Sequence, residues 1–284
     1  MSNCYLAIDV GSTRLAAAIV DDGGEVLVRD RVPTPAREVW PALARLVGRV
    51  LAAAPEAPGS VGVGCSGPMD LEARTVSPLH IPTWVAFPLA AEVESLTQLP
   101  TVVDHSAKAV ALAEAWKGAA RGWRDFATVV IGAGVSGAVV SGGRLLDGQH
   151  GNAGQIGHIV VEPDGRACRC GGKGCLEAYC GGRAIEEETG RPPQRAPQVI
   201  VERTGTFTGR ALASLAAVCD LRRAVVAGSV ALAFGDVFLA AARSELEQRA
   251  RLSFTQGFEV QPAALGQVAP LVGAAAFAKR ATHQ

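Results

Sequence analysis

The chain has 284 residues and carries 27 Lys and Arg against 27 Asp and Glu, so its formal net charge is zero. A balanced charge offers no basic surface for nucleic acid or an anionic membrane, which makes a small molecule the expected partner. The N-terminus lacks the basic start and apolar core of a signal peptide, and no uncharged stretch reaches bilayer length, so we expect a cytoplasmic protein.

The first part of the chain predicts a β-meander followed by a helix. Apolar runs of strand length occupy Tyr5–Asp9, Leu15–Val20 and Glu25–Val32, and glycine-containing turns separate them. Apolar residues within 37–54 recur at helical spacing, which predicts a helix lying over the sheet. The segment Val61–Cys65 is the next expected strand.

The same order of elements recurs later in the chain. FATVVIGAGVSGAVVSGGRLL (residues 126–146) repeats the strand, Gly turn, strand, Gly-Gly turn and strand of YLAIDVGSTRLAAAIVDDGGEVL (residues 5–27). This repeat predicts two similar α/β domains, at residues 1–106 and 107–284, with the last helix able to pack back on the first domain.

Charged and apolar segments alternate in the rest of the chain. AIEEETGRPPQRAPQ (residues 184–198) predicts a charged, Pro-containing loop, and a helix is expected around Arg210–Val218. AVVAGSVALAFGDVF (residues 224–238) predicts a strand, a Gly turn and a helix, and LVGAAAFAKRA (residues 271–281) predicts a final helix.

Three cysteines and a histidine form the clearest chemical motif. Cys168, Cys170 and Cys175 lie close together, and His158 precedes them within a glycine-rich segment. Three thiolates and one imidazole match a closed, structural tetrahedral zinc site, here a loop of residues 158–175. The alternative is a set of unpaired buried or reactive cysteines.

Three glycine turns follow predicted strands and are candidate nucleotide-binding segments. Backbone N–H groups in such turns can cradle phosphate, and a nearby hydroxyl or carboxylate can position Mg²⁺. Glycine at these places can also simply serve a tight turn. The candidate residues are Asp9, Gly11, Ser12, Thr13, Gly132, Gly134 and Gly228.

These segments together resemble the ROK family of sugar kinases and repressors. The motifs are DVGSTR, GVGCSGPMD, PTW, VDHSAKAVALAE, IGAGVSG, GNAGQIGH, CRCGGKGC, AALG and LVGAAA, and they extend over nearly the whole chain. The resemblance implies a duplicated actin-like, hexokinase-like (ribonuclease H-like) two-domain ATPase fold with a zinc-binding loop. It also implies transfer of phosphate from ATP, with Mg²⁺, to a hexose, amino sugar or related polyol. We further expect a homodimer.

The resemblance assigns roles to particular positions. In ROK kinases an Asn-Asp pair opens the central helix, the Asp being the general base, while a Glu, the zinc-bound His and a second Glu hold sugar hydroxyls. Where the family often has Asn in a further loop, this chain has His80. The other corresponding residues here are His105, Ser106, Gln155, His158 and Glu177.

The serine at the general-base position leaves several hypotheses open. A hydroxyl is too weak a base near neutral pH, whereas the adjacent His105 has a suitable ordinary pKa. Alternatively, Ser106 caps the helix and His105 is a hydrogen-bonded loop residue. The protein is then either a sugar kinase or a pseudokinase that binds sugar or nucleotide as a sensor. A DNA-binding repressor is disfavoured because the first strand starts by residue 5, and other chemistry by His105 and His158 has no further support.

Overall fold

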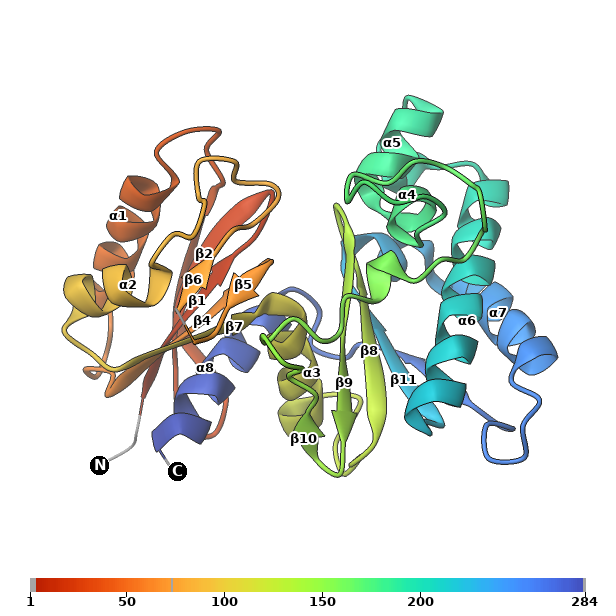
Figure 1. Cartoon of the computed structure of the whole chain (residues 1–284). Coiled ribbons are helices and arrows are strands. Elements are labelled where there is room, and N and C mark those ends of the chain that lie inside the picture. Colours follow the sequence, from red (N-terminus) through yellow and green to blue (C-terminus); the bar gives the residue numbers. More distant parts are fainter. Residues whose placement is uncertain (1–3, 73, 283–284) are drawn as a thin grey trace. The chain divides into compact units, whose positions relative to one another are not determined.

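The computed structural model describes residues 4–72 and 74–282, and these form two compact units (Figure 1). Each unit contains a five-stranded sheet. Unit 1 is made from the described residues of Met1–Lys117, Asp147–Ala153 and Val268–Gln284, and unit 2 is made from Gly118–Leu146 and Gly154–Gln267.

Unit 1 has a mixed sheet in the order β3-β2-β1-β4-β7. The pairs β1–β2 and β2–β3 are antiparallel, while β4 is parallel to both β1 and β7. The short strands β5 and β6 form a separate ribbon. The elements are β1 (Tyr5–Val10), β2 (Arg14–Val20), β3 (Val26–Pro33), α1 (Val39–Ala52), β4 (Ser60–Cys65), β5 (Met69–Asp70), β6 (Thr75–Val76), α2 (Leu89–Thr97), β7 (Thr101–His105), α3 (Ser106–Lys117) and α8 (Ala269–Thr282).

Unit 2 repeats this topology in the order β10-β9-β8-β11-β12, with the same antiparallel and parallel pairs. This repeat confirms the duplicated α/β architecture. The 3-10 turn η3 (Gly266–Val268) leads from unit 2 into α8. The elements of unit 2 are β8 (Phe126–Ile131), β9 (Val135–Ser141), β10 (Arg144–Leu145), η1 (Ile156–His158), α4 (Glu177–Cys180), α5 (Gly182–Thr189), η2 (Pro193–Arg195), α6 (Gln198–Cys219), β11 (Arg223–Ala227), α7 (Ser229–Arg249) and β12 (Glu259–Pro262).

The central strand β1 is buried on both faces, which explains its continuous apolar sequence. Leu6 and Ile8 belong to the core that includes α1, whereas Tyr5 and Ala7 belong to the core that includes α8. Alternate residues of a strand point to opposite faces, so one apolar run serves two helical layers. Helix α8 therefore buries the second face of β1, and it is part of unit 1 although it lies at the other end of the chain.

Helix α3 belongs to unit 1, so the division falls after Lys117 rather than at the expected residue 106. The reason is close packing of α3 on α8, where a Cβ built on Gly273 would lie 1.7 Å from the carbonyl oxygen of Ala109. Helix α8 is likewise part of unit 1, as is the short segment Asp147–Ala153. Packing between distant segments, rather than chain order, sets this boundary.

The expectation of a loop over residues 184–198 is wrong for its first part, which forms α5. Ile185 is completely buried, and the Glu residues that follow it favour helix and remain accessible on the outer side. The helix ends at Gly190, whose φ of 65° is the usual left-handed C-terminal stop. The run of three glutamates made the segment read as a charged loop in the sequence, although one of its faces is buried.

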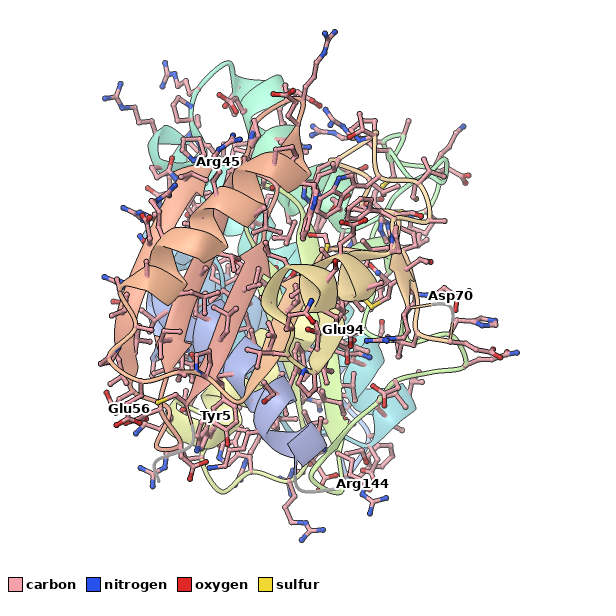
Figure 2. The ribbon with its side chains drawn as sticks, turned by 90° about the vertical axis from the view of Figure 1, so that its left-hand side faces the viewer. Tyr5, Arg45, Glu56, Asp70, Glu94 and Arg144 are labelled. Carbon is pink, nitrogen blue, oxygen red and sulfur yellow. The ribbon has the colours of Figure 1, made fainter. Side chains whose placement is uncertain are left out.

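The loop that contains β5 and β6 is tied to α2 by a bidentate ion pair. Arg74 donates to both carboxylate oxygens of Glu94, at 2.6 and 3.2 Å, and to the carbonyl oxygen of Thr101. Figure 2 shows Glu94 on α2 beside this loop. The pKa of Glu94 is lowered, chiefly by the hydrogen bonds from Arg74.

Among the described residues, no helix combines the length and apolar character needed to cross a bilayer.

The contact between α3 and α8 gives a first prediction. Replacing Gly273 with Ala should lower the free energy of unfolding by about 3 kcal/mol, because the added methyl group would overlap the Ala109 carbonyl. Replacing Gly48 with Ala is the matched control, since that exposed position in α1 has open space around its Cβ. The control should gain about 0.5–1 kcal/mol in urea unfolding. Equal effects of the two substitutions would contradict the packing argument.

Candidate functional site

The expected site residues fall into two groups, one in each unit. Unit 1 carries Asp9, Gly11, Ser12, Thr13, His80, His105 and Ser106. Unit 2 carries Gly132, Gly134, Gln155, His158, Cys168, Cys170, Cys175, Glu177 and Gly228.

Asp9 lies near the carboxyl end of β1 and is only 6% exposed. Burial raises the pKa of this carboxyl to about 6, and the nearby charge of Arg14 opposes that shift. The turn that follows is closed by the Gly11 N–H, which donates to the Arg14 carbonyl at 3.0 Å. Ser12 is half-buried and Thr13 is exposed in this turn. A carboxylate and two hydroxyls thus share one end of the central hairpin.

Ser106 begins α3 and lies over strand β4. A Cβ built on Gly64 would be 3.3 Å from the Cα of Ser106, and Gly64 pairs with Asp9 across β1 and β4. The strand β4 therefore brings Asp9 and Ser106 together at the carboxyl edge of the unit 1 sheet. A side chain at position 64 would make a tight contact with the start of α3.

His105 is a buried, hydrogen-bonded residue at the end of β7. Its side chain interacts with Asn152, and a Cβ on Gly67 would lie 2.4 Å from its Nε2. Burial lowers the pKa of His105 to about 4, and the charge of Lys108 acts in the same direction. These contacts favour the hydrogen-bonded alternative over a replacement base.

Lys108 is a residue of this region that the sequence analysis did not single out. Its side chain is 0% exposed, and its ammonium donates to Asp147 Oδ1 at 2.8 Å and to the Gly151 carbonyl at 3.0 Å. The third partner is Asp104, whose Oδ1 lies 3.1 Å away. Burial raises the pKa of Asp104, and the charge of Lys108 opposes this. The available signal was an acid at the end of an apolar strand, four residues before a lysine on the apolar helix that follows.

The segment 147–153 is anchored to unit 1 by a second set of bonds. The Asn152 side chain accepts from the Met69 N–H at 3.0 Å and donates to the Met69 carbonyl at 2.8 Å. Gly151 lies against Leu71, since a Cβ there would be 2.4 Å from the Leu71 Cγ. The segment follows β10 and precedes Gln155, so its anchoring fixes the chain that enters the metal loop.

Two expected substrate-contacting residues lie in loops. His80 is half-buried in the connection between β6 and α2. Gln155 is half-buried and immediately precedes η1, the turn that carries His158.

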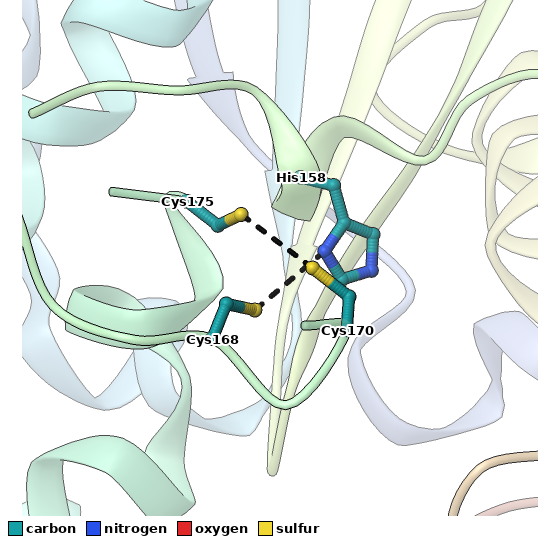
Figure 3. A group of neighbouring side chains, drawn as sticks. All are labelled: His158, Cys168, Cys170 and Cys175. Atoms are coloured by element: carbon teal, nitrogen blue, oxygen red, sulfur yellow. Dashed lines mark hydrogen bonds between the residues drawn. The ribbon is translucent and has the colours of Figure 1, made fainter. Parts of the chain in front are cut away.

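The side chains of His158, Cys168, Cys170 and Cys175 converge on one point (Figure 3). Their ligand atoms all lie within 4.8 Å of one another. Cys170 and Cys175 have their sulfurs 3.8 Å apart, and Cys168 Sγ is 3.8 Å from His158 Nδ1. A tetrahedral zinc with Zn–S bonds of about 2.3 Å would place two sulfurs about 3.8 Å apart. The four donors thus fit a zinc ion in both chemistry and spacing.

The thiols differ in their acidity. Burial first, and then the neighbouring thiols, raise the pKa of Cys175 to about 12. The hydrogen bond at the Gly172 backbone is the largest of the effects that lower the pKa of Cys170. A metal bound here would hold all three as thiolates and displace their protons.

A cluster of Arg166, Tyr179, Glu188 and Arg203 packs against the metal loop. The Tyr179 hydroxyl accepts from the Arg166 N–H at 2.8 Å, and the Arg166 guanidinium lies 4.8 Å from the centre of the Tyr179 ring. Glu188 accepts from both Arg166 and Arg203, and these two hydrogen bonds hold its pKa well below the usual range. The loop is therefore partly ordered by contacts other than a metal.

Glu177 anchors the glycine turn of unit 2. The Val135 N–H donates to Glu177 Oε2 at 2.7 Å, and a Cβ on Gly134 would lie 2.5 Å from the same oxygen. The turn at Gly228 is beside it, because a Cβ there would be 2.3 Å from the carbonyl oxygen of Ile131. Two of the three candidate nucleotide-binding turns therefore meet at the carboxyl ends of β8 and β11.

The buried ion pairs of Lys108 give a second prediction. Replacing Lys108 with Met should lower the free energy of unfolding by about 3 kcal/mol, because Asp104 loses its partner at a largely buried position. Limited proteolysis within residues 147–153 should also become faster. The control is Lys117 replaced by Met, whose partner Glu25 has a side chain that is 70% exposed. The control should cost less than about 1 kcal/mol, and a larger loss there would contradict the argument.

Comparisons with known proteins extend over nearly all of this chain. A family model described as the ROK family matches residues 5–281. An N-acetylmannosamine kinase of Escherichia fergusonii is 34% identical over 260 residues, which cover 86% of this chain and 88% of that protein.

Solved structures agree with that result. A ROK hexokinase from Thermus thermophilus is 32% identical with a TM-score of 0.83, and 100% of this chain and 99% of that one are covered. A ROK glucokinase from Streptomyces griseus, solved in complex with glucose and AMPPNP, is 28% identical with a TM-score of 0.85, covering 98% of this chain and 100% of that one. The expected hexokinase-like fold is thereby confirmed, and the chain belongs to the ROK family.

Proposed function

We propose that the protein is a carbohydrate kinase of the ROK family that transfers the γ-phosphoryl group of ATP to a hydroxyl of a hexose, an amino sugar or a related polyol. The observation that carries this proposal is the similarity to an N-acetylmannosamine kinase over most of both chains. The glycine turn joined to Glu177 supports it, because the turn provides backbone donors beside the motif assigned to the sugar.

The nucleotide would bind the glycine turns of unit 2. Gly132 and Gly134 lie after β8, and Gly228 directly precedes α7, whose first N–H groups suit an anion. In unit 1, Asp9 is the carboxylate suited to hold Mg²⁺ or its water ligands. When bound, Mg²⁺ would neutralise charge that develops on the phosphates.

The metal loop would hold a structural zinc ion through His158, Cys168, Cys170 and Cys175. Four protein donors complete a tetrahedral site and leave no position for a reacting water. The ion would therefore shape the loop rather than activate a substrate. Gln155, His158 and Glu177 are the residues that would contact sugar hydroxyls from this loop, and His80 would contribute from unit 1.

The zinc site is tested by elemental analysis. Protein purified without chelator should contain about one zinc per chain, because the donor set is complete within this loop. Replacing Cys175 with Ser should remove most of the metal and lower the melting temperature. Replacing Cys219 with Ser is the control, since that thiol is not one of the four donors, and its zinc content should be unchanged. Metal-free wild-type protein would refute the site.

The proton acceptor is the feature in which this chain departs from the pattern that the family resemblance implies. A positioned base contributes about 10² to 10⁴ to a rate, and a serine hydroxyl cannot supply that. Phosphoryl transfer depends mainly on positioning and charge stabilisation, so turnover without the base is still chemically feasible. Asp9 and Ser106 border the same glycine, which keeps one carboxylate near the vacated position.

The kinase proposal is tested by restoring the carboxylate. Replacing Ser106 with Asp should raise phosphotransfer about 10²-fold or more with a suitable sugar, because it supplies the missing base. Release of ADP with a panel of hexoses, amino sugars and polyols measures this rate. Ser95 replaced by Asp is the control on an exposed position of α2 and should leave the rate unchanged. No gain, together with no shift in melting temperature from ATP, would refute the kinase.

A pseudokinase that binds sugar or nucleotide as a sensor is the second candidate. The observation that favours it is the environment of Ser106, the position that the resemblance assigns to the general base. There His105 is buried, and Asp104 is paired with Lys108. A shift in melting temperature from sugar alone, without ADP release by either the wild type or the Ser106→Asp variant, would support the sensor.

A further inference from the structure

We infer that the metal loop braces the Gly132–Val135 turn, and that Glu177 is the positioning residue through which the metal sets nucleotide affinity. The inference rests on the proposed function in one respect, namely that this turn binds the phosphates. The bracing itself is a property of unit 2 alone. It follows from three sets of contacts that the segments flanking the metal loop make with the turn and with the start of β9.

The first contact involves the arm of the loop that carries His158. A Cβ on Gly157 would lie 2.1 Å from the Val135 carbonyl oxygen, so η1 is packed directly on the first residue of β9. The neighbouring Ile156 lies against Gly137, where a Cβ would be 2.3 Å from Ile156 Cδ1. Movement of His158 therefore displaces the start of β9.

The second contact involves the arm that carries Cys175. Only Leu176 separates this ligand from Glu177, whose carboxylate accepts the Val135 N–H at 2.7 Å. The two arms thus hold the same residue from two sides, η1 at the carbonyl of Val135 and Glu177 at its amide. A metal bound by His158 and Cys175 would cross-link these arms.

The third contact fixes the direction of the peptide groups in the turn. The Gly182 N–H donates to the Gly132 carbonyl at 2.8 Å, and the Arg183 N–H donates to the Ala133 carbonyl at 3.0 Å. The carbonyl and N–H of a trans peptide point in opposite directions. The N–H groups of Ala133 and Gly134 therefore point away from residues 182 and 183. Adjacent N–H groups held in this way suit an anion such as phosphate.

Other bonds between the arms limit the expected effect of metal loss. The Leu176 N–H donates to the Ile159 carbonyl at 2.9 Å, and the Val161 N–H donates to the Gly174 carbonyl at 2.9 Å. The arms should stay paired without the metal, while the turn should open more often. The inferred role of zinc is thus to hold the turn in the orientation that binds phosphate.

Hydrogen exchange measured by mass spectrometry tests the bracing without any nucleotide. Exchange in a peptide covering residues 131–137 should be about tenfold faster after removal of zinc by a chelator, and similarly faster in zinc-loaded Glu177→Ala. Glu177→Gln should restore slow exchange, because its Oε1 can still accept from Val135. The control is Glu186→Ala, an exposed position of α5, which should match the wild type.

Calorimetric titration with the non-hydrolysable analogue AMPPNP and Mg²⁺ tests the consequence for binding. The dissociation constant should rise about tenfold in Glu177→Ala and in the zinc-free protein, and stay unchanged in Glu186→Ala. Unchanged exchange in both zinc-free protein and Glu177→Ala would overturn the brace. Altered exchange with no binding of AMPPNP to the zinc-loaded wild type would instead overturn the assignment of the turn to the nucleotide.

Discussion

The hydrogen bond from the Val135 N–H to Glu177 joins the two features of unit 2 on which a kinase would depend. On one side is a loop whose four donors fit a zinc ion, and on the other is a glycine turn at the end of a central strand. Because the bond is charge-assisted and the turn has no side chain at Gly134, the carboxylate sits directly against the backbone. Under the proposed function, Glu177 would contact a sugar hydroxyl and would also support a turn that binds phosphate.

In unit 1 the charged groups near Ser106 have a structural role, because they connect α3 to β7 and to the segment 147–153. The Lys108 ammonium forms ion pairs with Asp104 and Asp147 and donates to the Gly151 carbonyl. The imidazole of His105 is buried and hydrogen-bonded to Asn152. The helix that begins at Ser106 therefore carries a buried group of ion pairs and hydrogen bonds around Lys108, here called the clamp. The clamp fixes residues 147–153, which lead into the metal loop of unit 2.

One scaffold can serve both a kinase and a sensor, so the distinction rests on the residues of the site rather than on the fold. The comparisons show the family, and the glycine turns and the four converging donors are the features that the proposed kinase would use. Asp9, whose pKa burial raises to about 6, and Ser106 border the same glycine of β4, so the carboxylate proposed to hold Mg²⁺ lies beside the position that the resemblance assigns to the base. A binding protein would need the turns and the loop but not the base.

The sequence alone determined the features that depend on local spacing. The strand runs and turns of residues 5–27 and 126–146 predicted the duplicated sheets, and the spacing of Cys168, Cys170 and Cys175 predicted a metal loop, because both patterns consist of residues that are close together in the chain. Only the tertiary structure placed α3 and α8 in one unit, turned part of a predicted loop into α5, and gave Lys108 its partners. Asp147 and Gly151 are far from Lys108 in the chain, and the bond between Glu177 and Val135 spans 42 residues. Such contacts arise from the packing of whole elements, which no local pattern of residues encodes.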